Sequence, residues 1–220
     1  TFTCHYHIEH ATKLIEVREK KGKAALPAAL REPEFVEVFK ESGMQIVHLA
    51  EFHNRLGRSR RDPDKALPLL ETLHAECARL SDKEFLLLPG EEPNVHLGGH
   101  WISFFPRPVM WVLNRAKGKP FVEEHPKFGR VYHVGSPEDV LKLMEAEKGL
   151  MWTAHPRIKS STGFPDFYRD KPFFQSDRYL GGAWKAMPAD LSRPRLGWRV
   201  LDLLDDMSNW GARKHVVGEV

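Results

Sequence analysis

Two patterns of apolar residues alternate along the chain and predict two kinds of element. The apolar runs typical of buried strands are residues 44–50, 85–88 and 150–154. The segments with apolar residues at helical spacing are residues 34–42, 65–80, 136–148 and 197–209. Strands that alternate with helices indicate parallel β/α units, in which functional residues gather at the carboxyl ends of the strands.

Histidines mark the start of the chain in a spacing that suits metal binding. Side chains alternate faces along a strand, so His5 and His7 share one face, roughly 6.5–7 Å apart. His10 follows where we expect the strand to turn into a loop. Imidazole is the commonest protein metal ligand, and this pair could hold one ion.

Similar residue types follow each of the predicted strands. His53 comes after the strand at 44–50, and His155 comes directly after the strand at 150–154. Glu92 follows the strand at 85–88, and His100 lies eight residues later. Metal-ligand types repeated at strand ends predict the rim of a barrel that carries a metal cluster. His74, by contrast, falls within a predicted helix and is expected on its surface.

The order of these motifs resembles that of the PHP (polymerase and histidinol phosphatase) metallohydrolases, most closely their carbaryl-hydrolase-like branch. The matching motifs are His5-Tyr6-His7 for H-x-H, His53-Asn54 for the end of T-D-H-N, Pro89-Gly90-Glu91-Glu92 for P-G-x-E, Gly99-His100 for G-H and Ala154-His155-Pro156 for A-H-P. Glu51 and Phe52 depart from the family pattern. The resemblance covers about residues 3–157.

The resemblance implies an α/β fold, a distorted (β/α)7 TIM-like barrel formed by residues 1–220 as one domain. It implies two or three divalent ions, Zn, Mn or Fe, and a hydrolase that acts on a small phosphoester or a carboxylic or carbamic ester. The implied metal ligands are His5, His7, His10, His53, Glu92, His100 and His155. Glu92 is expected to bridge two ions and to be essential for catalysis. Arg157 is either a clamp for a phosphate or carboxylate or a surface residue.

The last family motif, D-x-H, has no counterpart in the chain. Residues 213–220 are typical of the strand that precedes it, so either Glu219 replaces the aspartate or the motif lies beyond Val220. The chain also starts directly on the first predicted strand. We therefore expect a barrel that is truncated at both ends.

Residues 158–195 show little periodicity and include seven aromatic residues. Long irregular segments inside a compact domain are often functional, so we expect a lid over the site. The competing interpretation is that these aromatic side chains fill the core.

Composition narrows the range of partners. The net charge of +3 gives no reason to expect a nucleic-acid partner, and no apolar run approaches the ~20 residues that span a membrane. No signal peptide is visible, so a cytoplasmic location is expected, although a truncated start could have removed one. Cys4 and Cys77 form no disulfide framework, and Cys4 is expected in the core.

Two other classes of function stay open at this stage. An amidohydrolase-type enzyme also begins with H-x-H on a barrel strand, but its late aspartate and modified lysine are not found here. A non-catalytic domain that retains part of a metal site is the second alternative.

Overall fold

The computed structural model describes residues 2–21, 26–50, 62–157, 161–185, 202–203, 205–210 and 214–219. Backbone contacts divide the chain into two compact units. Unit 1 comprises Thr1–Glu91 and Arg107–Val134, and unit 2 comprises Glu92–Pro106 and Gly135–Val220. Each unit has its own sheet or sheets and its own buried side chains.

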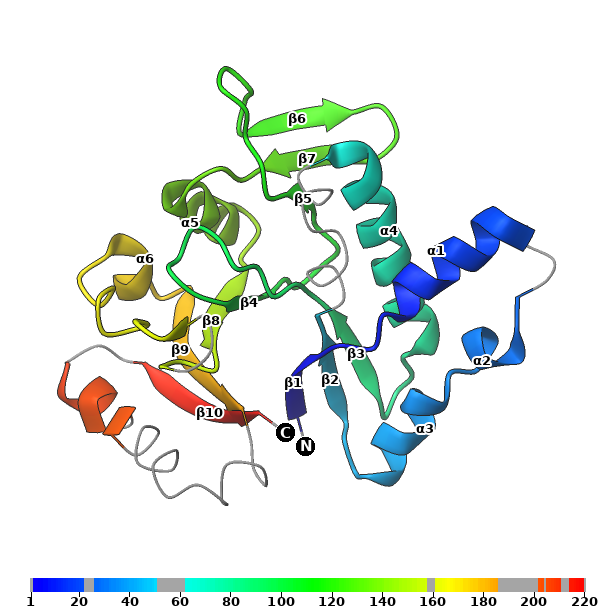
Figure 1. Cartoon of the computed structure of the whole chain (residues 1–220), viewed down its shortest axis with the longest axis horizontal. Coiled ribbons are helices and arrows are strands. Elements are labelled where there is room, and N and C mark those ends of the chain that lie inside the picture. The colour runs from blue at the N-terminus through cyan, green and yellow to red at the C-terminus, as the bar shows by residue number, and fades with distance from the viewer. Residues whose placement is uncertain are drawn as a thin grey trace. The chain divides into compact units, whose positions relative to one another are not determined.

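Unit 1 contains a parallel sheet of three short strands (Figure 1). Its order is β1 (Phe2–Tyr6), β2 (Ile46–Leu49) and β3 (Leu86–Pro89). The strands predicted at 44–50 and 85–88 are confirmed as β2 and β3. Ile46 pairs with both Phe2 and Leu86, so β2 is the central strand.

The helices of unit 1 are α1 (His10–Lys21), α2 (Ala28–Arg31), α3 (Glu34–Glu41) and α4 (Pro63–Leu80). α4 begins at the N-cap Asp62, whose side chain accepts a hydrogen bond from the backbone N–H of Asp64 at 3.1 Å. Its buried apolar residues recur at helical spacing along one face, namely Ala66, Leu67, Leu69, Leu70, Leu73 and Cys77. This face lets α4 contact β3 and α1.

Residues 107–134, which also belong to unit 1, form its second sheet. It contains β5 (Met110–Val112), β6 (Val122–His125) and β7 (Gly129–His133), in the order β5-β7-β6. β6 and β7 form an antiparallel hairpin, and β5 is parallel to β7. The polar sequence of β6 gave no strand signal, and this hairpin was not predicted.

Unit 2 is built on a four-stranded sheet with the order β10-β9-β8-β4. The strands are β4 (Trp101–Phe104), β8 (Leu150–Ala154), β9 (Tyr179–Lys185) and β10 (His215–Glu219). β8, β9 and β10 are parallel, whereas β4 runs antiparallel to β8. β8 coincides with the strand predicted at 150–154, and it is covered on both edges by neighbouring strands.

Unit 2 contains the helices α5 (Pro137–Ala146) and α6 (Pro172–Gln175), and the start of α5 has a clear sequence signal. α5 begins at the N-cap Ser136, whose hydroxyl accepts a hydrogen bond from Asp139 N at 3.2 Å, as Ser136-Pro137 predicts. α6 is a single turn that contacts both α5 and β9. Residues 202–203 and 205–209 are also helical, within the helix predicted at 197–209.

Within the segment at 158–195, the structure describes residues 161–185, which are partly regular, and the lid stays a prediction. The segment contributes α6 and the interior strand β9. Four of its aromatic residues, Phe164, Phe173, Phe174 and Tyr179, are buried, and their ring centroids lie 5.0 to 6.0 Å from those of partners within this group. The competing interpretation therefore describes these side chains better, because they form part of the core of unit 2.

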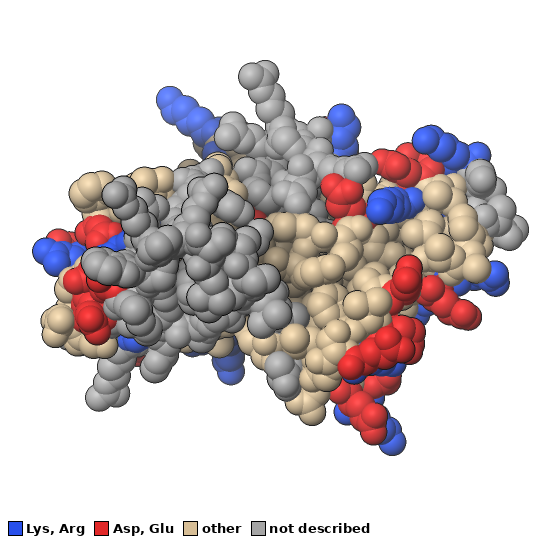
Figure 2. All heavy atoms as spheres, turned by 60° about the horizontal axis from the view of Figure 1, so that its bottom comes forward, with Lys and Arg blue, Asp and Glu red and all other residues tan. Residues whose placement is uncertain are grey.

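The described strands form three separate sheets, and the (β/α)7 barrel stays a prediction. On the face shown in Figure 2, the described acidic and basic side chains are interspersed. Within the described residues, no helix combines the length and the apolar character that a membrane span requires.

Candidate metal centre

One carboxylate in unit 2 meets two imidazoles at hydrogen-bond distance. Glu92 Oε1 lies 2.7 Å from His100 Nδ1 and 2.9 Å from His155 Nε2. The two rings lie 5.0 Å apart between centroids, at an angle of 55°. The possible ligand atoms of all three residues lie within 4.8 Å of one another, so a single ion could reach them all.

Strand pairing explains why two histidines 55 positions apart in the sequence meet. His100 directly precedes β4, and His155 directly follows β8. Because β4 and β8 are antiparallel, the amino end of β4 lies beside the carboxyl end of β8. The backbone N–H of Ala154 donates to the carbonyl of His100 at 2.9 Å and closes this end of the ladder. His100 thus lies at an amino end, which corrects the expectation that every cluster marks a carboxyl end.

His155 is held in an unusual backbone conformation at the end of its strand. Its φ is 36°, in the left-handed region that costs non-glycine residues about 1–3 kcal/mol. Its backbone N–H donates to the carbonyl of Ala183 in β9 at 2.7 Å, which ties the residue to the second neighbouring strand. The fixed backbone directs the ring toward Glu92, and such strain is common at functional sites.

Burial makes this group suited to a cation. The exposed fractions of the side chains are 3% for Glu92, 2% for His155 and 15% for His100. A buried carboxylate is costly unless hydrogen bonds or a positive charge compensate it. Two histidines and a glutamate form a donor set known from catalytic zinc sites, which leave a further position open to water or substrate. The donor set therefore fits a divalent ion, with His100 on the solvent side.

The selection of Glu92 over its neighbour agrees with the P-G-x-E spacing. Glu91 is also fully buried. Only Glu92, however, belongs with His100 and His155 in the group that could hold an ion. The structure thus distinguishes two adjacent carboxylates that composition alone could not.

A serine that the sequence did not indicate positions His100. Ser161 Oγ accepts a hydrogen bond from the backbone N–H of His100 at 2.9 Å, and Ser161 is fully buried. A Cβ atom on Gly99 would lie 2.8 Å from the same oxygen, so only glycine allows this approach. The approach of Ser161 thus explains why glycine precedes His100 in the motif. The sequence did not indicate Ser161 as a site residue, because its partner is a backbone group.

In unit 1, His5 and His7 lie close together at the end of β1. Their ring centroids are 4.7 Å apart and the rings are nearly perpendicular. β1 ends at Tyr6, its pairing with β2 shifts between Thr3 and Tyr6, and His5 has a φ of 71°. The rings therefore come together through an irregular strand end rather than through the simple alternation that we predicted.

Neighbouring groups orient both of these histidines. His7 Nδ1 lies 2.6 Å from the carbonyl oxygen of Ala50, which can only accept, so Nδ1 carries the proton and Nε2 the lone pair. Such a carbonyl contact is the usual support for a metal-binding histidine. The backbone N–H of His5 donates to Nδ1 of the buried His48 at 3.4 Å.

His10 belongs to a different cluster from the one that we expected. It is the first residue of α1 rather than part of a loop, and its Nε2 bonds to Glu76 Oε2 at 2.8 Å. Arg79 donates to the same carboxylate at 2.6 Å and to the carbonyl of Arg31 at 2.8 Å. Burial alone would raise the pKa of Glu76, but the bonds from Arg79 and His10 outweigh it and lower that pKa. This network joins α1, α2 and α4.

His53 lies outside the described residues. Arg157 donates to Asp166 at 2.6 and 2.9 Å and also to Asp206. The bond to Asp166, with that to Asp206, raises the pKa of Arg157 against the lowering effect of burial. These carboxylates hold the Arg157 side chain within unit 2, and its role as a substrate clamp stays a prediction.

Comparisons of the chain with protein-family models, with curated proteins and with solved structures found no match.

Proposed function

We propose that this chain is a metal-dependent hydrolase that cleaves a phosphoester or a carboxylic or carbamic ester. The observation that supports this proposal most strongly is the convergence of Glu92 Oε1 with His100 Nδ1 and His155 Nε2. The order of the motifs, which resembles that of PHP metallohydrolases, supports the same reaction class. That resemblance also assigns His5 and His7 to metal binding.

The residues of unit 2 would divide the work of such a site. Glu92 supplies the negative charge, and His155 is held rigidly by the backbone of β8 and β9. His100 is the most exposed of the three, so substrate and water would approach from its side. When bound, a divalent ion would lower the pKa of water toward about 7 and polarise the ester or phosphoryl oxygen.

A hydrolysis assay tests the proposal. The chain is stripped with a chelator, reloaded with Zn²⁺, Mn²⁺ or Fe²⁺, and offered p-nitrophenyl phosphate, bis(p-nitrophenyl) phosphate, 1-naphthyl acetate and an aryl N-methylcarbamate. We expect at least one ester to be hydrolysed after reloading, no activity in the stripped protein, and no recovery in Glu92→Gln.

Glu91→Gln is the matched control, because it makes the same chemical change at the adjacent buried position. It should retain most of the activity. If metal binds at the Glu92 group but none of the four esters is cleaved with any ion, the hydrolase proposal fails and the non-catalytic alternative is favoured.

A further inference from the structure

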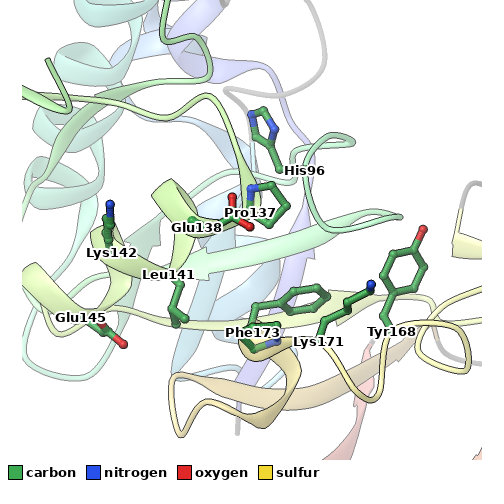
Figure 3. A pocket seen from close by; sticks show the side chains of 10 residues that line it. His96, Pro137, Glu138, Leu141, Lys142, Glu145, Tyr168, Lys171 and Phe173 are labelled. Carbon is green, nitrogen blue, oxygen red and sulfur yellow. The ribbon is translucent and has the colours of Figure 1, made fainter. Parts of the chain in front are cut away.

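A cavity of about 400 Å³ lies in unit 2 between the side chains of α5 and those of residues 168–173 (Figure 3). His96 lines a third side. Apolar side chains, among them Leu141 and Phe173, make up much of the lining. The volume falls in the range of small-molecule sites, about 300–1,000 Å³, and so does the mixture of apolar walls with a few polar groups.

The wall formed by Tyr168 is preformed. Gly98 has a φ of +81°, and a Cβ atom there would lie 2.0 Å from Tyr168 Cζ. The tyrosine ring therefore packs directly on the backbone of Gly98, where only glycine leaves room. The ring also stacks with Phe164, at 5.2 Å between centroids and 29° between planes. Because these contacts fix the ring, a ligand would not have to order it.

Charge is distributed unequally between the two walls. On α5, Lys142 lies four residues after Glu138 and three before Glu145, so carboxylates of its own helix flank its charge. On the opposite wall, Lys171 is the only charged side chain among the described lining residues. Its Nζ points toward the side chain of Tyr168 (Figure 3). An ammonium group and a phenol hydroxyl at one end of an apolar cavity suit an anion with an apolar body.

The chain itself keeps this cavity near the proposed metal centre. His96 lies four residues from Glu92 and four from His100. Four residues of fully extended chain span at most about 14 Å, which bounds the distance from the His96 backbone to both ligands. Ser161, which bonds to His100, also begins the segment that carries Tyr168 and Lys171. A ligand of ordinary size could therefore extend from one to the other.

We propose that this cavity binds the non-reacting part of the substrate, an organic anion with an aromatic or branched apolar body. The anionic group lies at Lys171 and the Tyr168 hydroxyl, and the apolar body lies against Leu141 and Phe173. The word substrate rests on the proposed hydrolase function, whereas the binding of such an anion does not depend on it.

Titration calorimetry with 2-naphthoate, and with the uncharged 2-naphthamide for comparison, tests this inference. We expect saturable binding of the acid, and a loss of affinity of about tenfold or more in Lys171→Met or with the amide. Lys142→Met is the matched control and should change the affinity less than about threefold, since Glu138 and Glu145 already offset that charge. Leu141→Trp should fill the cavity and abolish binding, with a thermal melt to show that the variant is folded.

The outcomes distinguish a failure of the proposed binding site from a failure of the proposed hydrolase function. The inference is overturned if 2-naphthoate shows no saturable binding, or if it binds the wild type and Lys171→Met with equal affinity. If Leu141→Trp unfolds, the comparison of the wild type with Lys171→Met decides. If 2-naphthoate binds but no ester is hydrolysed, the binding site stands and the hydrolase proposal fails. If esters are hydrolysed, 2-naphthoate should raise KM without changing kcat, and hydrolysis that it does not affect overturns the substrate assignment.

Discussion

His100 and His155 face each other at 5.0 Å because the start of β4 pairs with the end of β8. Glu92 accepts from both rings through one oxygen. The site is therefore fixed by sheet pairing at two positions and by the loop before β4 at the third. The hydrogen bonds that position the proposed ligands can therefore be tested by mutation, as the ligands can.

Ser161→Ala should weaken the support behind His100. The variant leaves the part-buried backbone N–H of His100 without this acceptor, which costs about 1–3 kcal/mol in the free energy of unfolding. If the proposed centre exists, metal affinity should also fall by roughly 10–100-fold, the usual effect of removing a group behind a ligand. Urea unfolding and a zinc-competition titration measure the two effects.

Ser42→Ala is the control for that variant. The Ser42 hydroxyl donates to the carbonyl of Val38 at an exposed helix end, so its removal should change stability by less than about 0.5 kcal/mol. Equal losses in the two serine variants would argue against a special role for Ser161.

Phe174→Ala should destabilise the protein by about 3–5 kcal/mol, because the ring is fully buried beside Tyr179. Phe167→Ala, in the same segment but 81% exposed, should have little effect. A melt of both variants decides between a core and a lid. If Phe174→Ala alters the Michaelis constant without lowering the melting temperature, the segment acts as a lid after all.

Glu76→Gln should lower stability at neutral pH by roughly 1.5–3 kcal/mol, because it removes the buried negative charge that Arg79 and His10 share and replaces one acceptor oxygen with an NH2 donor. Arg79 and His10 lower the pKa of Glu76 below its ordinary 4.5, so its contribution is present above that pH and is lost as the pH falls through the folded-state value. The difference in the free energy of unfolding between the wild type and Glu76→Gln should therefore become smaller below pH 4.5.

Glu71→Gln on the same helix serves as the comparison, since its side chain is 53% exposed and pairs with Lys127 only at 3.6 Å. Its effect should stay below about 1 kcal/mol. The explanation for Glu76 would be contradicted if the difference in the free energy of unfolding between the wild type and Glu76→Gln stayed constant from pH 7 to pH 4.

His74→Gln should reduce the sensitivity of the fold to mild acid. Burial lowers the pKa of His74 from 6.5 to about 4. Between these values the unfolded chain binds a proton that the folded chain does not, so His74 makes stability fall as the pH drops from 6.5 toward 4. Melting temperatures at pH 7 and pH 5 should differ less in the variant than in the wild type, and an unchanged difference would count against the burial of this side chain.

The sequence predicted several buried elements better than it predicted how those elements pair, and the chemistry of the site stays a prediction. β2, β3 and β8 are short apolar runs, and the Ser136 cap marks the start of α5, so both kinds of signal are local. The hairpin of β6 and β7 and the interior strand β9 lacked such signals, because polar residues or Gly181 and Gly182 interrupt their patterns. Register and strand direction depend on partners distant in the sequence, which is why the antiparallel β4 was not foreseen.

The contacts of individual side chains also depend on partners that are distant in the sequence. The motifs contain Glu92, His100 and His155, which lie together in the structure. His10 and Arg157 were named because they lie near a motif, and their carboxylate partners Glu76, Asp166 and Asp206 lie far away in the chain or in an aperiodic segment. His74 was expected on a helix surface, because its sequence neighbours do not show what covers it.

The most direct measurement of the central claim is the zinc content of three proteins prepared and dialysed together: wild type, Glu92→Gln and Glu91→Gln. The claim predicts at least about one equivalent of tightly held zinc in the wild type and in Glu91→Gln, with affinity about 100-fold lower in Glu92→Gln. A wild type that holds no zinc at saturation, or equal losses in the two glutamate variants, would contradict it.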